Sequence, residues 1–223
     1  MTARSASGST LEDFRQAAAS KEAVPAGVAI SAVSASFALG LLAKVLKIAS
    51  RRKDFSGDAP RARTLADLAE SESRRMLQYA DEDVAAFSGF MASAKLPQAT
   101  EPERDDRRRA LDAAIRKTIE TPMTAAHAAA KGVEHCEEAG ELVHSLVAAD
   151  LGTAAALLSN ALRIFLMCAD SNVKLLASNP ADYDSLMAGR PEFETKALRQ
   201  AQSVLGHVTT TIEAAGSKRR AKR

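Results

Sequence analysis

The chain of 223 residues is long enough for one sizeable domain, and its composition argues against a β-sandwich or a nucleic-acid-binding protein. It is 46% hydrophobic but only 4% aromatic, and it contains no tryptophan. Many of the apolar residues are alanines, which favours helices that pack closely through small side chains. The formal net charge is +2, but residues 216–223 are strongly basic, so the rest of the chain is mildly acidic. We interpret 216–223 as a solvated basic tail, with contact to an acidic partner as the alternative.

The cysteines and the N-terminus indicate a reducing, cytoplasmic location. Cys136 and Cys168 both fall in predicted helices and are too few for a disulfide framework. The first residues lack the apolar core of a signal peptide. The charge-free stretch 25–43 approaches the length of about 20 residues that spans a bilayer, but Lys44 and Lys47 follow it at once. We therefore expect core helices and no membrane contact.

The chain shows helical patterns and turn signals without any strand signal, so we predict an all-α fold. Residues 1–9 are small and polar, which predicts disorder. Thr10 has the position of an N-cap, and Pro122 falls inside a helical pattern that resumes after it, which predicts a kink. We expect a single-domain helical bundle over 10–215 with long central apolar helices. The expected helices cover about 11–20, 28–53, 63–94, most of the stretch between 104 and 140, 145–178 and 193–214.

The most apolar predicted helix, Ser145–Lys174, carries a carboxylate near its start, Asp150. A helix that is apolar on most faces belongs in the centre of a bundle. Burying a carboxylate there is costly unless it is paired or used. From the residues alone, Asp150 is therefore either a structural group, such as a helix cap or half of an ion pair, or a catalytic group.

The common signatures of phosphate loops and zinc sites are absent from the sequence. His127, His135 and His144 lie close together in sequence, but positions 127 and 135 would point in different directions on a helix. We interpret these histidines as surface residues and expect no metal site. The spacing indicates no Ser-His-Asp arrangement either.

Several short motifs follow one another along the chain. They are P-A-G-V-A at 25–29, R-R-K-D-F at 51–55, D-x-x-A-F…M…K-L-P at 83–97, T-P at 121–122 and A-D-L-G-T-A at 149–154. Their order and near-constant spacing resemble the cyclodeaminase domain of formiminotransferase-cyclodeaminase and the stand-alone bacterial methenyltetrahydrofolate cyclohydrolases. The resemblance begins at T-L-E-D-F, residues 10–14, and covers nearly the whole chain.

The resemblance implies an all-helical homodimer that acts on one-carbon units carried by tetrahydrofolate, without a metal. Two reactions are implied: hydrolysis of 5,10-methenyltetrahydrofolate to 10-formyltetrahydrofolate, and cyclisation of 5-formiminotetrahydrofolate with release of ammonia. We expect the cyclohydrolase reaction, because no formiminotransferase domain is attached to this chain.

The resemblance also implies roles for single residues. Asp150, Lys95 and Asp83 are expected to carry catalysis, because a carboxylate stabilises the cationic methenyl carbon and accepts a proton from attacking water. Lys95 would orient a ring oxygen or the one-carbon unit. The expected folate-binding residues are Pro25 and Gly27 in the turn, Arg52 and Lys53 for the anionic glutamate tail, and Asn172 for a pterin edge.

The chain departs from the family pattern around the expected substrate site. Ala26, Val28 and Ala29 stand where the family has two glycines and a serine. Ala149 replaces the serine before the aspartate, and Cys168 replaces an asparagine. Glycine would allow a close approach of the backbone to a ligand, which alanine and valine restrict. The alternative interpretation is therefore a non-catalytic family member that acts as a folate-binding or helical interaction protein.

Overall fold

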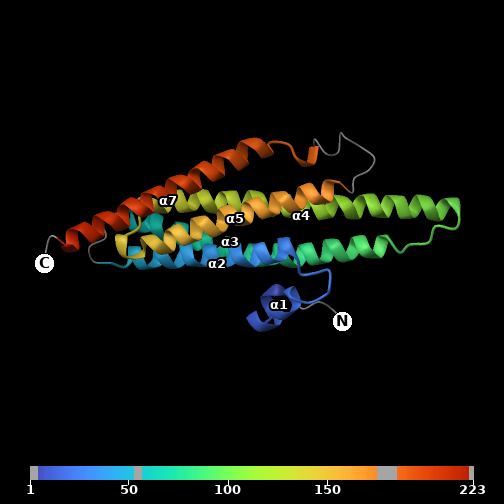
Figure 1. Ribbon diagram of the computed structural model, residues 1–223, viewed down its shortest axis with the longest axis horizontal. Coiled ribbons are helices and arrows are strands. Elements are labelled where there is room, and N and C mark those ends of the chain that lie inside the picture. Colours follow the sequence, from blue (N-terminus) through green and yellow to red (C-terminus); the bar gives the residue numbers. More distant parts are fainter. Residues whose placement is uncertain (1–4, 53–56, 175–184, 221–223) are drawn as a thin grey trace. The chain divides into compact units, whose positions relative to one another are not determined.

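The structure is a computed structural model, and it describes residues 5–52, 57–174 and 185–220. Every regular element in these ranges is a helix, which confirms the all-α prediction (Figure 1). The elements are η1 (Ala6–Gly8), α1 (Leu11–Ala18), α2 (Gly27–Ser50), α3 (Ala59–Ser93), α4 (Glu101–Gly140), η2 (Ser145–Val147), α5 (Ala148–Val173) and α7 (Arg190–Arg220). The Thr10 N-cap is confirmed, since its hydroxyl accepts a hydrogen bond from the Asp13 N–H. Helix α4 continues through Pro122 without ending there.

The chain forms two compact units, and each unit is assembled from separate segments. Unit 1 contains Met1–Val33, Leu77–Ala126 and Arg163–Arg190. Unit 2 contains Ser34–Met76, His127–Leu162 and Pro191–Arg223. Each of the helices α2, α3, α4 and α5 contributes residues to both units, so the predicted domain 10–215 contains parts of both.

Small side chains pack the core of unit 2, as the alanine content predicts. Ala35 and Ala38 of α2 are completely buried. A methyl group added to Gly132 of α4 would lie 3.1 Å from side-chain carbons of Leu39 and Leu158. Protein interiors have few voids, so a larger residue at position 132 would require these leucine side chains to shift.

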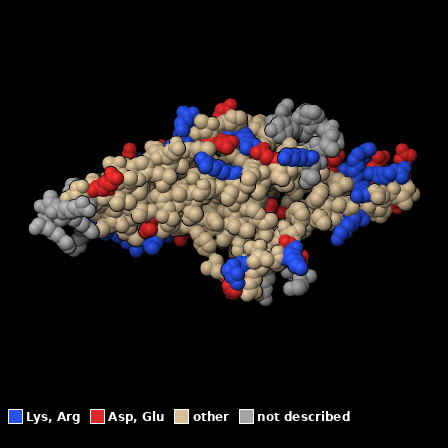
Figure 2. Space-filling view, in the orientation of Figure 1, with Lys and Arg blue, Asp and Glu red and all other residues tan. Residues whose placement is uncertain are grey.

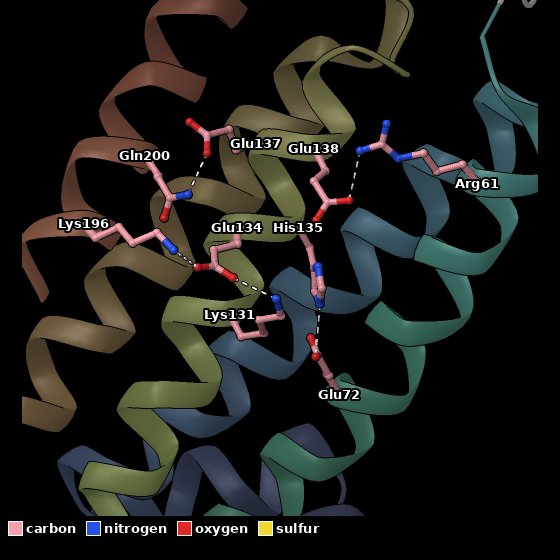
Figure 3. Close-up of polar contacts among 9 residues, drawn as sticks. All are labelled: Arg61, Glu72, Lys131, Glu134, His135, Glu137, Glu138, Lys196 and Gln200. Atoms are coloured by element: carbon pink, nitrogen blue, oxygen red, sulfur yellow. Dashed lines mark hydrogen bonds and ion pairs between the residues drawn. The ribbon is translucent and has the colours of Figure 1, made fainter. Parts of the chain in front are cut away.

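Polar side chains also link helices α3, α4 and α7 within unit 2 (Figure 3). The contacts are Arg61–Glu138 at 3.3 Å, Gln200–Glu137 at 2.6 Å, Lys196–Glu134, and His135–Glu72 at 3.2 Å. His135 is only 4% exposed, so its interpretation as a surface histidine is wrong. It faces α3 because α4 packs against that helix along this stretch (Figure 3).

The N-terminal residues from Ser5 on contact α3. Ala6–Gly8 forms a 3₁₀ helix, and Asp81 of α3 accepts hydrogen bonds from the Ser5 hydroxyl and the Ala6 N–H. The disorder expected for residues 1–9 stays a prediction. Residues 1–4 lie outside the described ranges. At the other end, α7 extends to Arg220, into the predicted tail 216–223.

Charged side chains gather at the start of α4, where Figure 2 shows neighbouring blue and red groups at the right of the view. Arg108 pairs with Asp105 at 2.9 Å, and Arg109 pairs with Asp106, each one helical turn apart. Such exposed pairs contribute about 0.3–0.5 kcal/mol each. This stretch is therefore a solvated helix face.

Two stretches, Gly27–Ser50 and Ser145–Val173, are long and apolar enough to cross a membrane by length and composition alone. Within the structure, 61% and 50% of their apolar windows are buried. Core helices of bundles pass the same test, so the expectation of no membrane contact stays a prediction.

Candidate functional site

Unit 1 contains a cavity of about 1110 Å³ between the N-terminal segment and α3. The α3 wall runs from Ala80 to Ala92, and Lys95, in the turn after the helix, extends it. The facing wall comes from residues 6–24. Pro25 and Ala29, at the start of α2, complete the lining. Pockets for drug-sized ligands measure roughly 300–1,000 Å³, so a ligand with several rings fits this cavity.

Asp83 of α3 is a buried carboxylate beside this cavity. Its side chain is only 8% exposed and accepts a hydrogen bond from the N–H of Ala29, which lines the cavity. Burial raises the pKa of Asp83 to about 6, although the Ala29 N–H lowers it in part. Asp83 follows Asp81 and Glu82 in an acidic run that would be expected on a solvated helix face, but the side chain of Asp83 is buried. A carboxyl that titrates near neutral pH can either accept or donate a proton there.

Gly27 and Cys168 lie close together at the N-terminal end of α2. A Cβ added to Gly27 would be 3.2 Å from the Cys168 sulfur, so a larger residue here would require the Cys168 side chain to shift. The pKa of the Cys168 thiol is raised by burial and, to a smaller extent, by the charge of Asp83. Cys168 and Asp83 are therefore neighbours. Cys168 and Ala29, two positions where the chain departs from the family pattern, both lie beside the Asp83 carboxylate.

Asn172 has a structural partner in unit 1. Its side-chain amide donates a 2.8 Å hydrogen bond to the backbone carbonyl of Thr118. Pro122 lacks an N–H, so the carbonyl four residues earlier, that of Thr118, has lost its partner within α4. Asn172 satisfies this carbonyl and so stabilises the continuous helix. The predicted contact between Asn172 and a pterin edge would use the oxygen and the second N–H of this amide, and it stays a prediction.

The other predicted residues of unit 1 lie at the cavity. Lys95 is exposed at one end of the α3 wall, and Pro25 lines the opposite side after a cis Val24–Pro25 peptide bond. The structure thus brings Pro25, Lys95 and Ala29 to one cavity, and the N–H of Ala29 is the hydrogen-bond donor to Asp83.

Asp150 and Arg52 belong to unit 2, separately from this cavity. Asp150 is half-buried in the first turn of α5, where the free N–H groups of a helix favour a carboxylate. Arg52 follows the end of α2, and Lys53 lies outside the described residues. Within the described ranges, no group of three or more His, Cys, Asp or Glu side chains is placed to hold a metal.

A sequence model of the formiminotransferase-cyclodeaminase family matches residues 10–184, most of the chain. The chain belongs to this family. The match includes Asp83, Lys95, Asp150 and Asn172, and it ends before α7. The resemblance inferred from the motifs is therefore confirmed.

Known members of the family show how far the similarity extends. The formimidoyltransferase-cyclodeaminases of Rattus norvegicus and Mus musculus are 26% identical to the chain over 114 residues, which is 51% of this chain and 21% of each relative. The chain thus spans about a fifth of the length of these relatives. The crystal structure of a formiminotetrahydrofolate cyclodeaminase from Thermotoga maritima superposes with a TM-score of 0.76 at 19% identity, covering 93% of this chain and 97% of that one. This superposition shows that the two chains share the fold.

Unit 2 contains a second cavity, of about 440 Å³, that was not predicted from the sequence. It is lined by Lys44, Lys47 and Arg51 of α2 and by Glu70 of α3, which pairs with Lys47 at 2.7 Å. The spacing of the three cations by three and four residues was a sequence signal that they share one helix face. The family resemblance gave a binding role only to Arg52 and Lys53, which follow these cations in the sequence.

Proposed function

We propose that this chain is a folate-dependent one-carbon enzyme that hydrolyses 5,10-methenyltetrahydrofolate to 10-formyltetrahydrofolate. The observation that carries the proposal is Asp83, a buried carboxyl with a pKa of about 6 beside a large cavity. Membership of the formiminotransferase-cyclodeaminase family supports a folate as the ligand.

Asp83 fits the chemical demands of the hydrolysis. The methenyl carbon of the substrate lies in a cationic amidinium, which an ionised carboxylate stabilises. Above pH 6, Asp83 is mostly ionised and can accept a proton from water as the water oxygen bonds to the methenyl carbon. The added hydroxyl then becomes the formyl carbonyl and loses its proton while the bond from that carbon to N5 breaks. N5 takes up a proton, and the formyl group stays on N10.

Lys95 and Asp150 have supporting roles in this proposal. The ammonium group of Lys95, at the end of the cavity wall, would orient a folate oxygen. Asp150 is the second carboxylate that we propose for the reaction, on the grounds of its position in the A-D-L-G-T-A motif. Arg52 and Lys53 are proposed to bind the anionic glutamate tail.

Cyclodeamination of 5-formiminotetrahydrofolate is the second candidate. It is favoured by the names of the relatives, which are cyclodeaminases of mammals and of Thermotoga maritima. In this reaction N10 attacks the formimino carbon and ammonia leaves. A protonated Asp83 would then donate its proton to the departing nitrogen, and a pKa near 6 also allows that role.

The test uses the purified full chain with both substrates. Loss of methenyltetrahydrofolate absorbance reports hydrolysis, and release of ammonium from the formimino compound reports cyclodeamination. We expect Asp83→Asn to reduce turnover by about 10²–10⁴-fold. Asp112→Asn, at an exposed site of α4 in the same unit, is the matched control and should retain full activity. Binding of folate without acceleration of either reaction would instead support the non-catalytic interpretation.

We also propose that the protein is a homodimer, as the family resemblance implies. Phe37 and Ile48 of α2 in unit 2 are 56% and 38% exposed, which leaves apolar surface available for a second copy. A molecular mass of one chain in small-angle scattering would contradict the dimer.

A further inference from the structure

The N-terminal segment 5–24 forms one wall of the unit 1 cavity but is weakly attached to the rest of the unit. None of its residues is buried, and Leu11 of α1 is 70% exposed. Within the described residues, its backbone hydrogen bonds to other backbone groups are all local to the segment. Segments with little buried apolar surface open at low free energy.

Asp81 provides an attachment of this segment to α3. The Ser5 hydroxyl donates to one carboxylate oxygen at 2.7 Å, and the Ala6 N–H donates to the other at 2.6 Å. Both are charge-assisted hydrogen bonds, which are stronger than neutral ones. Asp81 itself lines the cavity, so this attachment lies at the cavity wall.

Since these contacts join a loosely packed wall to the rigid helix α3, we propose that residues 5–24 are a cap that opens to admit ligand and that Asp81 is the positioning residue that closes it. The cap carries Phe14, Asp13 and Glu22 to the cavity, so closing brings both apolar and acidic groups against a ligand. Opening removes these groups and exposes the α3 wall. The cap itself does not depend on the reaction, whereas the identity of the ligand rests on the proposed function.

The test measures opening directly by trypsin cleavage after Arg15 and Lys21, two exposed cap residues, and by hydrogen exchange of the Ala6 amide. Asp81→Asn keeps the shape of the side chain, but it removes the negative charge that strengthens both hydrogen bonds. We expect both rates to rise about tenfold or more, with exchange in α4 unchanged. Asp112→Asn is the control and should leave both rates unchanged. Equal rates in wild type and Asp81→Asn, or a rise in exchange throughout the chain, would overturn the cap.

Two further measurements sharpen the result. Ser5→Ala should speed opening more in the wild-type chain than in Asp81→Asn, because both changes weaken the same contact. Additive effects would contradict the assigned attachment. Saturating 5-formyltetrahydrofolate should slow cleavage after Lys21 and should dissociate faster from Asp81→Asn than from the wild-type chain. If Asp81→Asn opens the cap but folate gives no protection, the proposed folate function fails while the cap stands.

Discussion

Units 1 and 2 differ in how their polar groups are used. In unit 2, carboxylates, cations and His135 pair across the contacts between helices, and Gly132 allows a tightly packed apolar core (Figure 3). In unit 1, Asp83 is buried with a backbone N–H as a partner, next to a large cavity that the weakly packed cap covers.

Under the proposed function, this difference is a loss of stability at the site of the chemistry. A carboxylate whose pKa is raised by burial destabilises the fold at neutral pH, and a cavity forgoes packing that a core would gain. Functional sites commonly retain such unfavourable features because activity needs them. Unit 2 shows a different use of the same residue types, since its charged groups connect helices. The two units are thus expected to respond differently to substitution.

The largest expected effect is on the pH profile of the reaction. With Asp83 as the base of the hydrolysis, kcat/KM should fall as the pH drops through about 6, because protonation removes the base. With Asp83 as the acid of the cyclodeamination, the rate should fall as the pH rises through about 6. Asp83→Asn should lower the rate about 10²–10⁴-fold and abolish the change in rate near pH 6. Measurements of kcat/KM between pH 4.5 and 8.5 test both expectations.

Asp150→Asn provides the comparison between units. We expect it to lower turnover while kcat/KM still changes near pH 6, because we assign that pH dependence to Asp83. If the pH dependence near 6 disappeared in Asp150→Asn but not in Asp83→Asn, the titrating group would lie in unit 2 and the assignment would be wrong.

The helices and the family were predictable from the sequence, while the arrangement of the site was only partly so. Periodicity and turn residues define helices locally, and Thr10 caps its helix as expected because capping is a local effect. Helix α4 continues through Pro122, as expected, while the kink there stays a prediction. The burial of Asp83 and the link between Asn172 and Thr118 depend on which helices meet, and periodicity does not encode that. For this reason the sequence directed attention to Asp150, whereas the cavity and the raised pKa direct it to Asp83.

A smaller effect is expected on the pH dependence of stability. Asp83 titrates near 6 in the folded chain and near 3.9 in the unfolded chain, so between these values the folded state binds the extra proton. The free energy of unfolding therefore decreases as the pH rises from about 4 to 6, by about 3 kcal/mol, and this group adds no further change above 6. Asp83→Asn removes the penalty while its oxygen still accepts from Ala29.

Chemical denaturation at pH 4 and pH 7.5 measures this contribution. Relative to wild type, Asp83→Asn should gain stability at pH 7.5 and little at pH 4. The Asp112→Asn control should show the same pH dependence as wild type. A variant less stable than wild type at pH 7.5 would mean that the carboxylate stabilises unit 1, and the raised pKa would then be wrong.

The smallest effect concerns the His135–Glu72 contact between α4 and α3 in unit 2 (Figure 3). His135→Ala removes a buried ring and leaves Glu72 without this partner, so we expect a loss of about 1–3 kcal/mol in the free energy of unfolding. Glu72→Gln keeps an oxygen that can accept from the ring Nε2 and should cost less. Arg108→Ala, which breaks an exposed pair on α4, should change stability by about 0.5 kcal/mol or less. All three variants should retain wild-type kcat below their melting temperatures, because unit 2 contributes these contacts to stability alone. A loss of turnover in folded His135→Ala would show that this contact also supports the chemistry, and the contrast between the units would no longer hold.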